Sequence, residues 1–167
     1  MTERSHFLCE FQLYGQRKLV IWYSNEKDGL LLNSRGNLAL FDSPAQAESH
    51  ARSLSIALEP QQTEQYDFDS LLAWCHKPNG SSFDYTRFLN AWNMLSDLSS
   101  SHGGWPKFQA IDSRLNTIYD KLFHGNNLPS ITPNGEHYEP SWSSKELHDL
   151  AKLFLTGIQE LHAIWAA

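Results

Sequence analysis

Hydrophobic and polar residues alternate along the first part of the chain in a way that is typical of strands. Residues 7–14 have apolar side chains at every second position, which is the period of a half-buried strand. Residues 18–24 contain a continuous apolar run, as in a central strand that is covered on both faces. Two shorter segments, 30–33 and 38–41, flank a glycine-containing turn. We therefore predict an N-terminal antiparallel β-meander of about four strands.

From residue 43 onward the apolar spacing changes to that of helices. Ser43 and Pro44 indicate a helix start, because serine can cap a helix and proline suits its first turn. Apolar positions at helical spacing then predict helices near residues 71–75, 84–99 and 115–122. These elements follow the meander and make the rest of the chain mainly helical.

The last helix has the strongest signal, because Ser143 and Glu146 form a capping box ahead of a long amphipathic pattern. The predicted fold is thus α+β: the meander with one helix, followed by a mainly α-helical part. With 167 residues, we expect a single domain over 1–167, with a sheet-plus-helix lobe at 1–60 and a helical lobe at 61–167.

Charge limits the possible partners. The formal net charge is −6, whereas phosphate binding needs clustered Lys and Arg, so we expect no nucleic-acid ligand. A basic protein is a better match for this chain. The longest apolar run near the N-terminus, Leu19 to Tyr23, is too short for a signal-peptide core or a membrane span. We expect a cytoplasmic protein that binds no membrane.

No motif specifies a catalytic or metal chemistry. The two cysteines, Cys9 and Cys75, indicate neither a disulfide framework nor a zinc site, and the histidines are scattered. We therefore expect no catalytic residue, no cofactor and no metal. Two alternatives remain open: a small hydrolase, which needs a carboxylate and a histidine converging in a cleft, and a helical adaptor, which needs an exposed apolar patch.

An acidic stretch, residues 59–70, is the main candidate for a binding surface. It carries carboxylates and aromatic rings and no basic residue. The carboxylates can steer a basic partner and the aromatic area can hold it. The alternative is a solvated linker in which Asp67 or Asp69 caps a helix. The candidate residues in this stretch are Glu59, Glu64, Tyr66, Asp67 and Asp69.

A second candidate surface is the long segment from Gly125 to Ser143, which has three prolines and neither hydrophobic period. A loop of this length in a compact domain is usually functional or disordered. Its candidate partner-binding residues are Glu136, Glu139 and Trp142. Trp142 could either anchor a partner or fill the core.

The segment DGLLLNSRGNLALFDSPAQAESHARSL, residues 28–54, resembles a hairpin-then-helix segment of small acidic bacterial immunity proteins. As a whole, the chain looks most like an immunity protein of a contact-dependent growth inhibition system. This resemblance implies an inhibitor without enzymatic activity that forms a 1:1 complex with the C-terminal domain of a cognate toxin, commonly a nuclease. It also implies that the inhibitor blocks the active site or substrate groove of the toxin.

Overall fold

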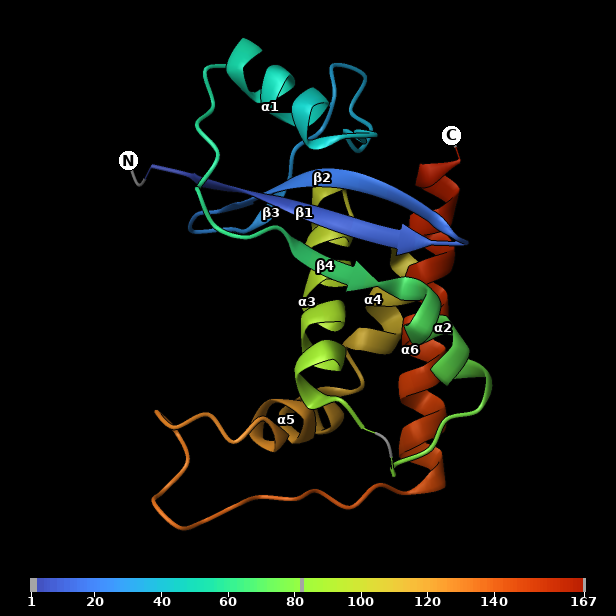
Figure 1. Cartoon of the computed structure of the whole chain (residues 1–167). Coiled ribbons are helices and arrows are strands. Elements are labelled where there is room, and N and C mark those ends of the chain that lie inside the picture. The colour runs from blue at the N-terminus through green and yellow to red at the C-terminus, as the bar shows by residue number, and fades with distance from the viewer. Residues whose placement is uncertain (1–2, 82, 167) are drawn as a thin grey trace.

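The computed structural model describes residues 3–81 and 83–166 and has an N-terminal mixed sheet with helices mostly in the C-terminal part (Figure 1). The predicted α+β class is confirmed. The strands, in sheet order, are β3 (Gly29–Leu30), β2 (Gln16–Ser24), β1 (Ser5–Leu13) and β4 (Glu64–Asp67). The helices are α1 (Pro44–Ser53), α2 (Phe68–His76), α3 (Tyr85–Ser101), α4 (Pro106–Asp112), α5 (Asn116–Gly125) and α6 (Ser144–Trp165).

β1 and β2 form a long antiparallel hairpin that turns at Tyr14 and Gly15. The φ angles of these two residues are 50° and 72°, both in the left-handed region. A two-residue turn with this backbone matches the twist of the flanking strands. The alternation seen in the sequence places Cys9, Phe11 and Leu13 of β1 in the main core.

The fourth strand of the sheet differs from the prediction. Residues 38–41 form only single bridges, Leu19 with Phe41 and Leu32 with Leu38, while the side chain of Asn33 accepts two backbone hydrogen bonds in the turn that precedes them. The fourth strand is β4, which comes from the acidic stretch and pairs parallel to β1. The sheet is therefore mixed, and within the acidic stretch residues 64–67 form an edge strand, while residues 59–63 connect to it outside any helix or strand.

Capping residues set the starts of several helices. Ser43 Oγ accepts a hydrogen bond from Gln46 N at the start of α1, and Ser143 and Glu146 form the predicted capping box of α6. Asp67 caps α2, which was one of the two predicted possibilities. α4 was not predicted, because its N-cap, Trp105, provides no side-chain hydrogen bond.

The main core joins the sheet to the helices. It includes Phe11 and Val20 from the strands and Leu95 and Phe154 from α3 and α6, so the two predicted lobes contribute side chains to the same core. Figure 1 shows α1 on one side of the sheet and α3, α4 and α6 on the other. β4 lies at the border of the sheet in front of α3, and this arrangement positions the candidate site.

Candidate functional site

A furrow runs between the edge strand β4 and helix α3. It consists of two adjoining hollows that share Tyr66 of β4 and Asn90 of α3. The Asp84 hollow, of about 240 Å³, is lined by Gln65, Tyr66, Asp67, Phe68, Leu71, Asp84, Thr86, Arg87, Asn90 and Ala91. The Asp97 hollow, of about 440 Å³, is lined by Trp22, Asp28, Glu64, Tyr66, Asn90, Asn93, Met94, Ser96 and Asp97. We call the two hollows together the β4–α3 furrow.

Asp97 is the half-buried carboxylate of this furrow. Trp22 Nε1 donates a hydrogen bond to Asp97 Oδ2 at 2.8 Å and thereby fixes its orientation. Burial raises the pKa of Asp97 and the nearby Asp28 raises it further, while the hydrogen bond from Trp22 acts in the opposite direction. The ionised form of Asp97 is therefore incompletely compensated, and a cation placed in the hollow would stabilise it.

Glu64 and Asp28 add two more carboxylates to the Asp97 hollow. Glu64 is exposed on β4 and accepts a long hydrogen bond from Asn90 Nδ2 at 3.4 Å, which joins the two walls of the furrow. None of the described residues that line this hollow is a Lys, Arg or His. The hollow therefore has three acidic groups and no cationic group among its lining residues.

Tyr66 forms the aromatic wall between the two hollows. Its ring meets the edge of Phe11 with centroids 5.6 Å apart and lies near that of Phe68, so part of the ring belongs to the core. Burial raises the pKa of the Tyr66 hydroxyl, and Cys9, Glu64 and Asp97 raise it further. Tyr66 is thus a neutral hydroxyl at neutral pH, able to donate a hydrogen bond within the furrow.

Asp67 lies at the rim of the Asp84 hollow but also has a structural role. Its carboxylate accepts hydrogen bonds from the backbone N–H and the hydroxyl of Ser70, at 3.0 and 2.6 Å. Partial burial raises the pKa of Asp67, but the bonds from Ser70 and the charge of Arg87 outweigh it, so the pKa lies below its ordinary value. Arg87, an exposed cation, lines the same hollow.

Asp69 does not line the furrow. Its carboxylate accepts hydrogen bonds from Tyr14 N and Gly15 N, at 2.5 and 2.9 Å, and a longer one from Gln12 Nε2. These bonds tie the start of α2 to the turn of the β1–β2 hairpin. Asp69 therefore stabilises the fold, although the sequence grouped it with the partner-binding residues.

Three other predicted carboxylates also lie outside the furrow. Glu59 is exposed beside the N-terminal part of β1, where its backbone N–H donates to His6 O. Glu136 and Glu139 are exposed in the loop between α5 and α6, residues 126–143. Of the predicted residues, the structure thus brings only Glu64, Tyr66 and Asp67 together.

Trp142 is held by contacts within the chain. Its ring stacks on that of Phe83 with centroids 4.6 Å apart, and its Nε1 donates to the hydroxyl of Tyr85 at 3.1 Å. The ammonium group of Lys121 lies 5.3 Å from the centre of the ring. These contacts give Trp142 a packing role at the end of the loop, between α5 and α6.

The same loop carries three exposed apolar side chains. Leu128, Ile131 and Tyr138 are 40%, 44% and 43% exposed. Asn127 closes the base of the loop, because its side chain donates to Tyr138 O and accepts from Tyr138 N. The loop therefore presents its apolar side chains from a fixed base.

Asp28, Asn90 and Asp97 line the furrow but were not predicted as site residues. Asn90 and Asp97 lie seven positions apart, on the polar stripe of a predicted helix, and such a stripe usually faces solvent. Asp28 lies in the turn between β2 and β3. No pattern in the sequence connects this turn to α3, because their proximity depends on the order of the strands.

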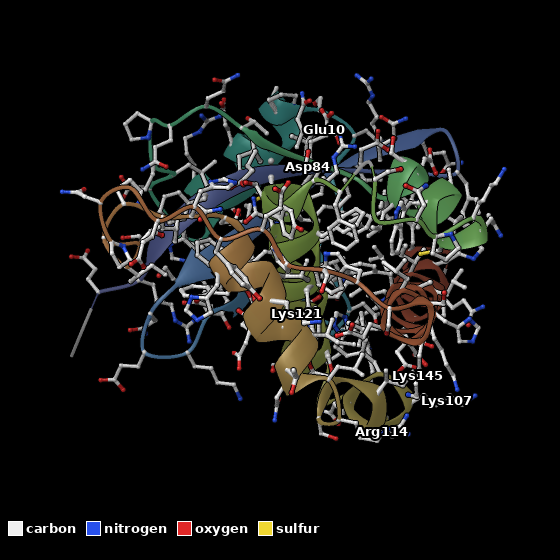
Figure 2. All side chains as sticks on the ribbon, turned by 90° about the horizontal axis from the view of Figure 1, so that it is seen from below. Glu10, Asp84, Lys107, Arg114, Lys121 and Lys145 are labelled. Atoms are coloured by element: carbon white, nitrogen blue, oxygen red, sulfur yellow. The ribbon has the colours of Figure 1, made fainter. Side chains whose placement is uncertain are left out.

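Several basic residues lie away from Asp84 of the furrow. In Figure 2, Asp84 and Glu10 lie toward one side of the molecule, and Lys107, Arg114 and Lys145 lie toward the opposite side. Lys145 is paired with Asp149 of α6, and Lys121, also labelled, is paired with Glu146. Of the hollows of the furrow, the Asp97 hollow is the one with carboxylates and no cation among its described lining residues.

The described residues offer little for other chemistries. They include no group of three or more His, Cys, Asp or Glu side chains that could hold a metal ion. Burial raises the pKa of each cysteine thiol, Cys9 and Cys75, to about 12, so neither is a thiolate at neutral pH. No helix within 3–81 and 83–166 has the length and hydrophobicity needed to cross a membrane.

No protein-family model, curated protein or solved structure matches this chain. The candidate site is therefore defined by its own geometry and charge. A half-buried carboxylate, two further carboxylates and an aromatic wall can bind a Lys or Arg side chain through charge-assisted hydrogen bonds and ring contact.

Proposed function

We propose that this chain is an immunity protein that binds a cognate bacterial toxin domain, a basic nuclease, and neutralises it in a 1:1 complex. In this proposal the β4–α3 furrow receives basic side chains that the toxin otherwise uses to hold nucleic-acid phosphates. The toxin is inhibited because its active site or substrate groove is covered. The immunity protein acts in the cytoplasm, without catalytic residue, cofactor, membrane or nucleic acid.

The observation that carries the proposal is the charge of the Asp97 hollow. Asp28, Glu64 and Asp97 line it without a cation among the described lining residues. A nuclease must present a basic surface to its substrate, and an acidic furrow can occupy that surface by electrostatic complementarity. The net charge of −6 also attracts a basic partner at long range. The resemblance of residues 28–54 to immunity proteins supports the same assignment.

A helical adaptor of a larger assembly is the second candidate. The exposed side chains of Leu128, Ile131 and Tyr138 favour it, because exposed apolar area is typical of protein-binding surfaces. A hydrolase has less support in the furrow, since no histidine is among the described residues that line its hollows, although His124, Glu136 and His137 line a separate hollow of about 620 Å³ beside the loop between α5 and α6. The two leading candidates predict different interfaces, acidic for the immunity protein and apolar for the adaptor.

The experiment is capture of the partner from the source cells, followed by a growth assay. Wild type and Glu64→Lys serve as baits, with Glu48→Lys as the matched control. Glu64 and Glu48 are both exposed, and each substitution changes the net charge equally, but Glu48 lies on α1, across the sheet from the furrow. A captured domain is then expressed in a test bacterium with and without each variant.

We expect wild type to retain a basic domain that stops growth, and co-expression of wild type to restore growth. Loss of a desolvated carboxylate at an interface costs about 2–5 kcal/mol, so Glu64→Lys should weaken binding about 30-fold or more, while Glu48→Lys should not. Capture of no growth-arresting protein, or equal protection by Glu64→Lys and wild type, would contradict the proposal.

A further inference from the structure

The outer edge of β4 has no backbone partner in the described part of the chain. Glu64–Asp67 pairs with β1, and no other strand within residues 3–81 and 83–166 pairs with it; the C=O of Asp67, the N-cap of α2, is directed into that helix. Because the N–H and C=O groups of a strand point alternately to its two edges, half of those in β4 face away from β1. An open edge of this kind can serve as a template for an added strand.

The Asp84 hollow, of about 240 Å³, adjoins this edge and opens toward solvent. Its lining includes residues of β4, of the start of α2 and of the N-terminal half of α3. Neighbouring strands lie about 4.8 Å apart, and successive side chains point to opposite faces. One row of side chains of an added strand would therefore face the apolar groups of Tyr66, Leu71 and Ala91, while the other row would lie toward the rim and solvent.

Charge selects the strand that fits. Glu64 and Asp67 belong to β4 itself, and Asp84 lies on the α3 side of the hollow. Like charges on neighbouring strands are destabilising, so a second copy of β4 or another acidic strand is disfavoured. Arg87 brings one positive charge against these three carboxylates. A strand with alternating basic and apolar residues matches both the rim and the apolar lining.

We infer that β4 is a docking edge for an extended segment of the partner, with alternating basic and apolar residues, which adds a fifth strand to the sheet. The inference rests on the proposed function, because it states how the basic partner is held. Main-chain hydrogen bonds supply affinity and the furrow supplies selectivity for the side chains.

The test uses a synthetic peptide of alternating lysine and valine, eight residues long, and the full-length protein labelled with ¹⁵N. A second peptide has the same sequence with every backbone nitrogen methylated, so it keeps the charges but lacks all backbone donors. NMR titrations measure both affinities and map the amide shifts. Glu64→Lys and Glu48→Lys are titrated in parallel.

We expect the unmodified peptide to bind about tenfold or more tightly than the methylated one, because only the first can pair with a strand edge. The largest shifts should fall on residues 64–67, and Glu64→Lys should weaken binding while Glu48→Lys does not. Equal affinities, absence of binding, or shifts confined to other elements would overturn strand addition. None of these results requires the toxin, so they are separate from failure of the capture experiment.

Discussion

Asp97 illustrates, at the scale of single residues, how a carboxylate can be retained at a cost to stability. It is half-buried, and its hydrogen bond from Trp22 only partly offsets the effect of burial on its pKa. A carboxylate in such a position destabilises the folded state relative to a neutral isostere. Its presence is explained if the charge is needed for binding, as functional sites often reduce stability.

The first prediction concerns Asp97→Asn, which removes the charge and keeps an oxygen for Trp22. Because the folded pKa of Asp97 lies above its unfolded value, the folded protein binds this proton more tightly than the unfolded chain. As pH rises from the pKa of Asp97 in the unfolded chain to its pKa in the folded protein, the contribution of Asp97 to the free energy of unfolding therefore falls. Above both pKa values this contribution stays unfavourable. We expect the variant to gain stability over wild type as pH rises.

Urea denaturation of both proteins between about pH 4 and pH 8 measures this difference, since the ordinary carboxyl pKa lies near the lower limit. The same variant should bind the captured toxin domain more weakly. A difference in unfolding free energy that does not change with pH would mean that the packing of Trp22, and not the charge of Asp97, determines the effect.

The second prediction concerns Asp69, whose carboxylate joins α2 to the hairpin turn through Tyr14 N and Gly15 N. Asp69→Ala leaves these two donors without their charged acceptor and should lower the free energy of unfolding by about 1–2 kcal/mol. Glu59→Ala is the matched control from the same acidic stretch, and its effect should stay within about 0.5 kcal/mol. Urea denaturation measures both, and equal losses would contradict the structural role of Asp69.

At the scale of elements, Gly157 allows α6 to approach α3 and α4 closely. A Cβ atom at this position would lie 2.8 Å from Leu95 Cδ1 and 3.2 Å from Phe108 Cδ2. Both neighbours are fully packed core side chains, so they cannot move aside freely. The missing side chain is therefore part of how the three helices meet.

The third prediction is that Gly157→Ala destabilises the protein. Alanine favours a helix over glycine by about 1 kcal/mol, but overpacking of a dense core costs about 1–3 kcal/mol, and we expect overpacking to dominate. Gly80→Ala is the control, because its Cβ would lie 3.6 Å from Trp142, an ordinary contact. Thermal unfolding measures both variants; a higher midpoint for Gly157→Ala would show that the helices can separate without loss.

The elements differ in how far the sequence predicted them. α6 was predictable because its start and its apolar face are local patterns, Ser143 with Glu146 and the spacing from Leu147 to Leu161. β4 was not, because a four-residue polar strand is stabilised by its partner β1 and not by its own composition. The furrow, too, could be predicted from the sequence only in part. Glu64 and Tyr66 could be proposed from the acidic stretch, but Asp97 joins them only because α3 packs beside β4.

At the scale of the whole molecule, the proposed interface depends on the distribution of charge. The chain carries a net charge of −6, and the furrow contributes acidic groups on one side, while Lys107 and Arg114 lie toward the opposite side (Figure 2). A basic partner that approaches such a molecule is steered toward the acidic side before contact. Steering acts on the rate of association, whereas the contacts in the furrow determine the rate of dissociation.

The fourth prediction follows from this separation. The association rate constant with the captured toxin domain should fall about tenfold or more between roughly 0.05 and 0.5 M salt, because the Debye length shortens to a few ångströms. The dissociation rate constant should change much less, since charges within the furrow are partly shielded from solvent. Stopped-flow fluorescence, with the furrow residue Trp22 as one reporter of binding, measures both constants.

Two variants distinguish the effect of the net charge of the protein from the effect of the charge within the furrow. Glu64→Lys and Glu48→Lys reduce the net negative charge equally, so both should lower the association rate constant at low salt. Only Glu64→Lys also places a cation in the furrow, and only this variant should raise the dissociation rate constant. If both variants changed the dissociation rate alike, the furrow would not be the contact surface, and the attraction would belong to the acidic molecule as a whole.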